Sequence, residues 1–231
     1  MLCFPPRLPS LIVALALAGS SGCSPSHMAV PPEVSEQAEV LPVTDRSVFR
    51  GAWANESFTL GPYRVSGVDR DWNSSSGFEA GPYSKNETTG GYSFKHRAGE
   101  SVSKGKCSTG SGSQEVEVGI GSGFSVGDEF GEYSRLTCTC EPGTEVHVET
   151  RGEEYTGFLQ LGDQRFDVRS ISGGVVEVLS GQPVGYRIDG PQEHHAVEVV
   201  PPGRVWLARS IDEDARRRLT CLLAGLLLHM P

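Results

Sequence analysis

Cysteines are the residues whose spacing most clearly indicates chemistry in this chain, which contains six of them. Cys107, Cys138, Cys140 and Cys221 lie in its second half or close to it, and four thiols can pair in three ways. Cys138 and Cys140 belong to one face of one predicted strand, about 7 Å apart, too far to bond to each other comfortably. We therefore expect a disulfide from Cys107 to Cys138 or Cys140, while Cys221 could equally remain a buried thiol.

Other reactive residue types form no convincing catalytic or metal-binding pattern. A zinc site is disfavoured because no histidine stands at ligand spacing from Cys138 and Cys140. The serines at 111 and 113 lack the strand-to-helix turn of a serine hydrolase, and His194 and His195 are expected to be exposed loop residues. We predict no catalytic residue, no metal site and no cofactor.

Short runs of alternating apolar and polar residues predict a mainly β protein. Val116, Val118 and Ile120 fall on one face of a strand, whereas Glu115 and Glu117 fall on the other. One buried and one wet side per strand is typical of antiparallel sheets. The expected strands are residues 63–68, 91–95, 114–120, 134–140, 145–149, 157–161, 165–169, 175–179, 196–200 and 204–207.

The C-terminal segment breaks this alternation and predicts a buried helix at 211–230. Ser210 and Glu213 form a capping box, which marks a helix start. Residues 219–230 are apolar around the whole helical circumference and span only about 18 Å, too short for a bilayer. We therefore expect an antiparallel barrel, or a strongly curved sheet, wrapped around this helix.

The predicted strands come first and the helix comes last, and the runs 183–188 and 196–200 lead into the helix. This order resembles the tubby C-terminal, LURP-one-related and phospholipid scramblase group. The resemblance implies a barrel with a helix as its core. Members of the group that bind phosphoinositides use basic residues. The only basic cluster visible along this sequence is Arg216, Arg217 and Arg218, which we expect to be a solvated helix turn beside acidic residues.

The N-terminal region predicts export. Residues 11–18 form an apolar stretch that leads through small residues to Cys23, which indicates a signal peptide at 1–22. The site resembles the lipobox of bacterial lipoproteins. That resemblance implies fatty acylation, including palmitate, on Cys23, and Ser24 implies the outer membrane. A plain secretory signal is the alternative. Residues 23–46 are expected to be a lipidated, flexible tether, and residues 47–231 a single domain.

Charge limits the choice of partners. Removing residues 1–22 removes Arg7, so the formal net charge changes from −9 to −10. An acidic chain has no long-range attraction for phosphate, so nucleic-acid binding and polybasic docking on membranes are disfavoured. The expected contact with the membrane is therefore the N-terminal lipid.

The sequence favours a non-catalytic envelope module that binds a protein, a glycan or another envelope component. Its candidate contact residues are the aromatics Trp53, Trp72, Tyr83 and Tyr92. One alternative is a lipid-active or hydrolytic enzyme whose site is scattered over several strands. Another is a eukaryotic glycoprotein with a C-terminal GPI signal, in which Asn55, Asn73 and Asn86 would carry glycans.

Overall fold

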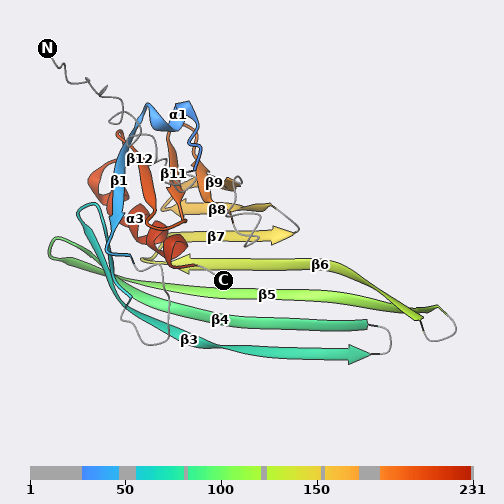
Figure 1. The fold of residues 1–231 in the computed structure, drawn as a ribbon. Helices are drawn as coiled ribbons and strands as arrows, with labels where there is room; N and C mark the ends of the chain where they lie inside the picture. Colours follow the sequence, from blue (N-terminus) through green and yellow to red (C-terminus); the bar gives the residue numbers. More distant parts are fainter. Residues whose placement is uncertain are drawn as a thin grey trace, which may run out of the picture.

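The computed structural model describes residues 28–46, 56–80, 83–120, 124–151, 154–171 and 183–229. Figure 1 shows the arrangement of the helices and strands. They are, in order, α1 (Pro32–Ser35), β1 (Ala38–Thr44), β2 (Phe58–Leu60), β3 (Tyr63–Ala80), β4 (Tyr83–Ala98), β5 (Ser101–Ile120), β6 (Phe124–Thr139), β7 (Thr144–Arg151), β8 (Tyr155–Leu161), β9 (Gln164–Ile171), β10 (Gly185–Asp189), β11 (His194–Glu198), β12 (Arg204–Ala208) and α3 (Glu213–Leu228).

The strands form a closed antiparallel barrel, as the sequence predicted. Each strand pairs with its neighbours in the chain, and β1 closes the ring by pairing with β12. Alternation explains the arrangement, because Val146 and Val148 of β7 are buried whereas Glu149 of the same strand is exposed. The expected strand at 175–179 lies outside the described residues.

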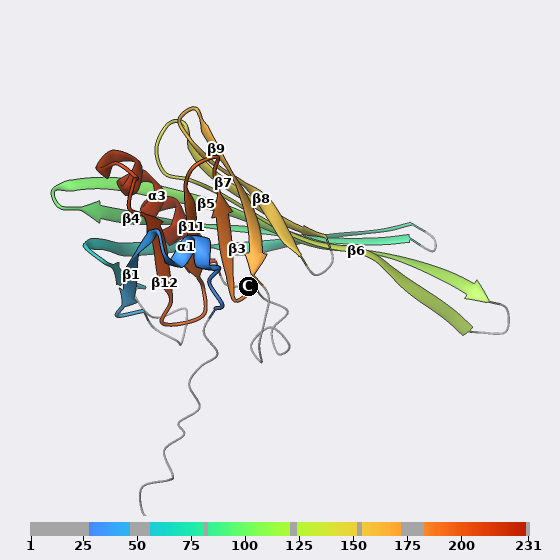
Figure 2. The ribbon, with the colours of Figure 1, turned by 90° about the horizontal axis from the view of Figure 1, so that it is seen from above.

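Helix α3 forms the core of the barrel. Leu219, Leu222, Leu223, Leu226 and Leu227 are all 0% exposed. The helix contacts strands β4 to β8 and β11, so its apolar circumference is covered from several sides (Figure 2). This burial supports a structural role for the C-terminal tail rather than a removable GPI signal. In the described part of the chain, neither helix is long and apolar enough to cross a membrane.

Both ends of α3 have partners for their free backbone groups. Asp212, not Ser210, is the N-cap, and its carboxylate accepts hydrogen bonds from the amides of Asp214 and Ala215. The predicted capping box is therefore wrong, since Ser210 instead donates to Glu193. The helix also begins later and ends earlier than the predicted 211–230, because Asp212 is extended and His229 has left helical geometry.

At the C-terminal end, side chains from three barrel segments bind the last carbonyls. Tyr92 donates to the carbonyl of Gly225, Arg46 to that of Leu227 and Arg70 to that of Leu228. Two guanidinium groups at this end also complement the negative pole of the helix dipole.

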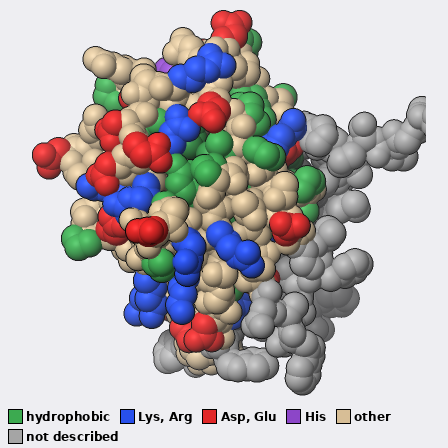
Figure 3. Space-filling view, turned by 90° about the vertical axis from the view of Figure 1, so that its left-hand side faces the viewer, with side chains coloured by type: hydrophobic (Ala, Val, Ile, Leu, Met, Phe, Trp, Pro, Cys, Tyr) green, Lys and Arg blue, Asp and Glu red, His purple; other side chains and the backbone are tan. Residues whose placement is uncertain are grey.

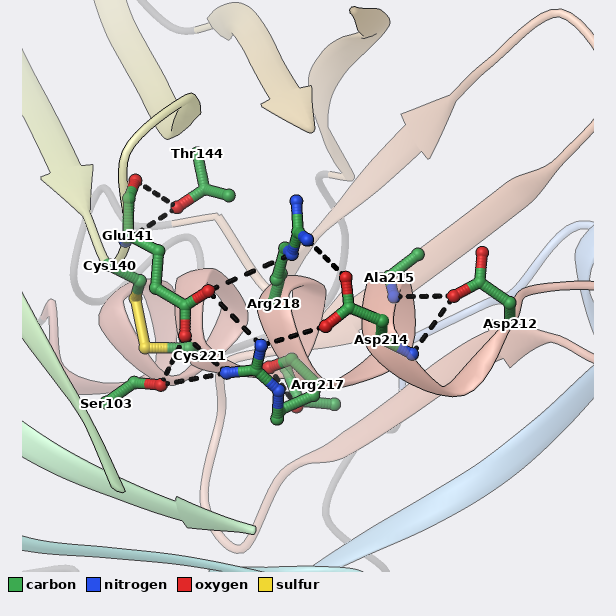
Figure 4. A network of polar contacts seen from close by, with 11 residues as sticks. Ser103, Cys140, Glu141, Thr144, Asp212, Asp214, Ala215, Arg217, Arg218 and Cys221 are labelled. Atoms are coloured by element: carbon green, nitrogen blue, oxygen red, sulfur yellow. Dashed lines mark hydrogen bonds and ion pairs between the residues drawn. A yellow bond between two sulfur atoms is a disulfide. The ribbon is translucent and has the colours of Figure 1, made fainter. Parts of the chain in front are cut away.

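Two disulfides join the barrel and the helix. Cys107 of β5 pairs with Cys138 of β6, which confirms the predicted bond. The second bond joins Cys140 to Cys221, so the alternative of a free thiol at Cys221 is wrong. Cys140 follows the last residue of β6 and can reach the helix from there (Figure 4). The two bonds are compatible with an extracytoplasmic location.

The predicted tether at 23–46 is too long. Residues 28–46 belong to the domain, because β1 pairs with both β12 and β2. Met28 and Val34 are also buried, in a small second core on the outside of the barrel. The Pro- and Glu-rich composition of this segment hid a strand, one of whose two pairing partners, β12, lies more than 150 residues away in the chain.

Strands β3, β4, β5 and β6 extend far beyond the rest of the barrel (Figure 1). They contain 18, 16, 20 and 16 residues, whereas β10, β11 and β12 contain 5 each. We call their distal part the arm. It consists of residues 74–80 of β3, 83–89 of β4, 110–120 of β5 and 124–132 of β6. The remainder of the described chain is the body.

Candidate anion-binding face

Five basic residues lie close together on the outer face of β3, β4 and β5, toward the strand ends that lie away from the arm. They are Arg64, Lys95, Arg97, Lys104 and Lys106, and all are exposed. The residues between them point inward, where Phe94 and His96 are buried. Gly105, between Lys104 and Lys106, leaves the space that the Phe94 ring fills, because a Cβ there would lie 2.2 Å from the ring.

Strand register places like charges directly opposite each other. Arg64 pairs with Arg97, and Lys95 pairs with Lys104. Directly opposed side chains on a sheet are about 5 Å apart, and like charges at such positions are destabilising. These opposed cations repel each other, and the strands could pair equally well with neutral side chains at these positions.

These five cations have no hydrogen-bonding side chain and no ion-pair partner among the residues that the structure describes. Other cations of the chain are paired, for example Arg70 with Glu56 at 2.7 Å and Arg216 with Glu39 at 2.6 Å. The nearest acidic positions by register are Asp69, opposite Ser93 next to Lys106, and Glu145, opposite Thr139. Figure 3 shows Lys and Arg side chains grouped in the lower part of the molecule.

An exposed apolar side chain adjoins this group. Val102 is 51% exposed, and it pairs with Arg97 on the outer face. We call Arg64, Lys95, Arg97, Val102, Lys104 and Lys106 the basic face. Guanidinium and ammonium groups at this spacing can bind phosphate or carboxylate groups, and an apolar residue among them adds a contact for acyl chains.

The expectation that Arg216, Arg217 and Arg218 form the only basic cluster is therefore wrong. Antiparallel pairing brings together cations that stand up to 42 positions apart in the sequence, from Arg64 to Lys106. A search for consecutive basic residues cannot detect such a group.

The three consecutive arginines are instead ion-paired at the start of α3 (Figure 4). Arg217 binds Glu141 and Asp214, and its guanidinium also donates to Ser103 at 3.1 Å. Arg217 lowers the pKa of both carboxyl groups, mainly through these hydrogen bonds. The network fastens α3 to β5 and to the turn between β6 and β7, which is a structural role.

Two histidines are buried, and one of them, His195, differs from the expectation. His195 is 0% exposed rather than on an exposed loop, and its Nδ1 accepts a hydrogen bond from the amide of Ala208. His96 is equally buried and stacks on Tyr63, with the ring centres 5.3 Å apart. Burial lowers the pKa of each to about 4, so both are neutral at physiological pH.

His194 contacts a carboxylate, as a general base often does, with Nδ1 2.8 Å from an oxygen of Asp189. Asp189 also forms an ion pair with Arg187 at 2.7 Å. Within the described ranges, no hydroxyl or thiol forms a hydrogen bond with His194. The contact joins directly paired residues of β10 and β11 and stabilises that hairpin.

The predicted contact residues have mixed outcomes. Trp53 and the proposed lipidation site Cys23 lie outside the described residues. Trp72 and Tyr83 stand on β3 and β4, and their side chains also fall outside the description. Tyr92 is only 3% exposed and holds the C-terminal end of α3, so its assignment as a contact residue is wrong. Among the described residues, no group of three or more His, Cys, Asp or Glu could hold a metal ion.

Comparison of the chain with known protein families, with curated proteins and with solved structures gave no match.

Proposed function

We propose that this chain is an exported envelope lipoprotein, acylated at Cys23, whose barrel is a non-catalytic binding module. Its basic face binds the anionic headgroups of a lipid surface. The observation that carries this proposal is the pairing of like charges across β3, β4 and β5 without a compensating partner in the described chain. Phosphate groups of a membrane would supply the missing counter-charge.

The geometry favours a surface over a small ligand. The cations lie on the outside of a sheet, at three successive levels along the strands, and their neighbour Val102 projects from the same face. A flat group of cations with an adjacent apolar residue matches the boundary between headgroups and acyl chains. The negative net charge of the protein does not oppose this contact. At physiological salt the field of each charge is screened beyond about 8–10 Å, so the membrane responds to the locally positive face.

The two membrane contacts complement each other. Several acyl chains on Cys23 would hold the protein firmly at the membrane, and the basic face would add a second contact with the lipid headgroups. Residues 24–27 between Cys23 and the domain give a tether far shorter than the one predicted from sequence. The anchor would therefore hold the domain close to the surface on which its basic face acts.

Vesicle binding tests the basic face. The chain is mixed with phosphatidylcholine vesicles that contain or lack phosphatidylglycerol, and the bound fraction is measured after flotation. We expect binding that requires phosphatidylglycerol and weakens in high salt. The double variant Lys95→Glu/Lys104→Glu should bind at least tenfold more weakly, since each basic residue contributes about 1 kcal/mol near an anionic surface.

The matched control is Arg165→Glu/Arg169→Glu, which makes the same change in charge at exposed positions of β9. Equal losses in both variants would show a general effect of net charge and would overturn the assignment. Equal binding to vesicles without phosphatidylglycerol, or equally strong binding to DNA, would also contradict it. The mass of the mature N-terminal peptide tests acylation of Cys23 separately.

A further inference from the structure

The two edge strands of the arm pair on one side only among the residues that the structure describes. β3 pairs with β2 at residues 63–65, and the pairing of β6 with β7 begins at Tyr133. Beyond these residues, β3 pairs with β4 alone and β6 with β5 alone. The arm projects beyond the described strands of the body, so those strands do not cover its edges (Figure 1). Backbone groups at such an edge can pair with a strand of another chain.

The part of β3 nearest the body is protected against such pairing. Its register against β4 shifts between Ser66 and Asp69, and it shifts again between Asp71 and Ser74. Each shift inserts an extra residue into β3, which interrupts the regular row of backbone groups. Asp69 and Asp71 add two exposed carboxylates. Bulges and charges are the features by which natural proteins keep edge strands apart.

The distal part of β3 differs in both respects. From Ser74 to Ala80, consecutive residues pair with β4 without a shift. This segment contains no lysine, arginine or proline, and Glu79 is its only charged residue. The side chains of residues 74–77 are small and exposed, so they do not block the approach of a second strand. Residues 74–80 therefore form a regular, nearly uncharged edge.

The other edge of the arm is less suited to contact between copies. Segment 124–132 of β6 contains three acidic residues, Asp128, Glu129 and Glu132. Two copies joined through β6 would bring together six carboxylates, whereas two copies joined through β3 would bring together only the two Glu79 residues. Like charges close together on neighbouring strands are destabilising. Charge therefore favours β3 as the contact.

Residues 74–80 can pair with the same segment of a second copy. A two-fold axis through Gly77 aligns the two segments in antiparallel register. Ser75 then lies opposite Glu79 of the other copy. The two Glu79 positions are four residues apart along the paired strands, about 14 Å, which exceeds the screening length of about 8–10 Å. Self-pairing through β3 therefore places no like charges directly opposite each other.

We infer that two copies of this protein join through residues 74–80 of β3, so that their arms form one antiparallel sheet. The order β6-β5-β4-β3 of one copy continues as β3-β4-β5-β6 of the other. The bodies lie at opposite ends of this sheet, because the paired strands run in opposite directions. The contact is short, so we expect a dimer that dissociates on dilution.

The dimer presents both basic faces on one side of the joined sheet. Ser76 pairs with Glu87, which belongs to the same face of β4 as Lys95 because they are an even number of residues apart. In the dimer Ser76 lies opposite position 78 of the other copy, which belongs to this same face. Two basic faces can therefore bind one lipid surface together. This consequence rests on the proposed function, whereas the dimer itself does not.

Sedimentation equilibrium tests the dimer in the absence of membranes. Residues 1–22 are replaced by a histidine tag and Cys23→Ser prevents acylation. We expect dimers at about 100 μM that dissociate on dilution. A monomer at that concentration would overturn the inference. Oligomers that keep growing beyond the dimer would also overturn it, because pairing of β3 with β6 of another copy produces an open chain.

Two opposite charges at Ser75 test the register. Ser75→Asp places a carboxylate opposite Glu79 of the other copy, twice in each dimer, and should weaken dimerisation about tenfold. Ser75→Lys places an ammonium group there and should strengthen dimerisation about threefold. Ser125→Asp and Ser125→Lys make the same changes in β6 and should have little effect. Thermal unfolding of all four variants should match that of the wild-type protein, since Ser75 is exposed.

Effects of the same sign for Ser75→Asp and Ser75→Lys would overturn the inference, as would equal effects at Ser75 and Ser125. On phosphatidylglycerol vesicles, Ser75→Asp should bind several-fold more weakly than Ser125→Asp, which adds the same charge but keeps the dimer. Equal binding would contradict the joint use of two basic faces. If the wild-type protein dimerises in solution but does not bind these vesicles, the proposed function fails and the dimer stands.

Discussion

The body and the arm are built from the same strands but are stabilised differently. In the body, one face of each strand packs on α3, and two disulfides and several ion pairs join distant segments. In the arm, the four strands extend away from the body (Figure 2) and pair only with one another. Ser, Thr and Gly occupy many of their positions. Folding energy is therefore concentrated in the body, and the arm remains available for contacts outside the chain.

The largest expected effect is from a charge inside the body. Leu223 of α3 is 0% exposed, so Leu223→Asp buries a carboxylate without a partner. The cost of several kcal/mol is comparable to a typical total stability of about 5–15 kcal/mol. We expect loss of soluble, cooperatively folding protein in gel filtration and thermal denaturation. Val102→Asp, at an exposed position, is the control, and a folded Leu223→Asp variant would contradict the role of α3 as core.

Removing the bond between α3 and the barrel should have the next largest effect. Cys140 and Cys221 are 81 positions apart, so their bond closes a long loop. Cys140→Ala/Cys221→Ala should lower the free energy of unfolding by about 2–5 kcal/mol in denaturant titrations, while the fold is kept. A change below about 1 kcal/mol would show that packing alone holds the helix.

Acid should destabilise the body. The pKa values of His96 and His195 are lowered to about 4 by burial, whereas an unfolded histidine has a pKa near 6.5. The unfolded chain therefore binds more protons between these values. Stability is complete above pH 6.5 and falls as the pH approaches 4, by at most about 1.4 kcal/mol per pH unit for each histidine.

Measurements of the free energy of unfolding from pH 7 to pH 4 check this prediction. Lowered pKa values of Glu141 and Asp214 add a loss of the same sign at the acidic end. His96→Gln should flatten the profile between pH 6.5 and 4. A profile that is independent of pH in the wild-type protein would rule out the burial of two neutral histidines.

The smallest effect is expected in the arm, and two serines of β5 provide a direct comparison. Ser103 in the body is buried, donates to Glu141 at 2.6 Å and accepts from Arg217. Ser103→Ala should cost about 1–2 kcal/mol in equilibrium unfolding. Ser111 in the arm is exposed, and Ser111→Ala should change stability by less than about 0.5 kcal/mol. Equal costs would mean that the arm contributes to the folded body.

Much of the fold could be predicted from local patterns. Alternation identified most strands, and the uniformly apolar C-terminal segment identified the barrel core because 12 apolar residues too short for a bilayer must be buried within the protein. The bond between Cys107 and Cys138 was also foreseeable, since both lie in strands. Local patterns failed at β1, whose pairing with β12 replaces the expected tether.

The candidate site could not be predicted in the same way. Arg64, Lys95 and Lys104 are separated in the sequence by acidic, polar and glycine residues, so they form no consecutive basic run such as the one at 216–218. Only the register of β3, β4 and β5 places them side by side. Tyr92 was assigned to a contact surface from its residue type, but tertiary packing places it inside the barrel. Its position in the sequence gave no sign that its hydroxyl would bind the C-terminal end of α3.

By itself, the sequence determined which residues lie in strands, which segment is the core, and that each strand has a polar and an apolar side. These properties depend on neighbours in the chain and on the periodicity of the backbone. The tertiary structure decided which strands meet, how far four of them extend, and where the basic face forms. Those properties depend on pairing between distant segments, which local composition does not encode.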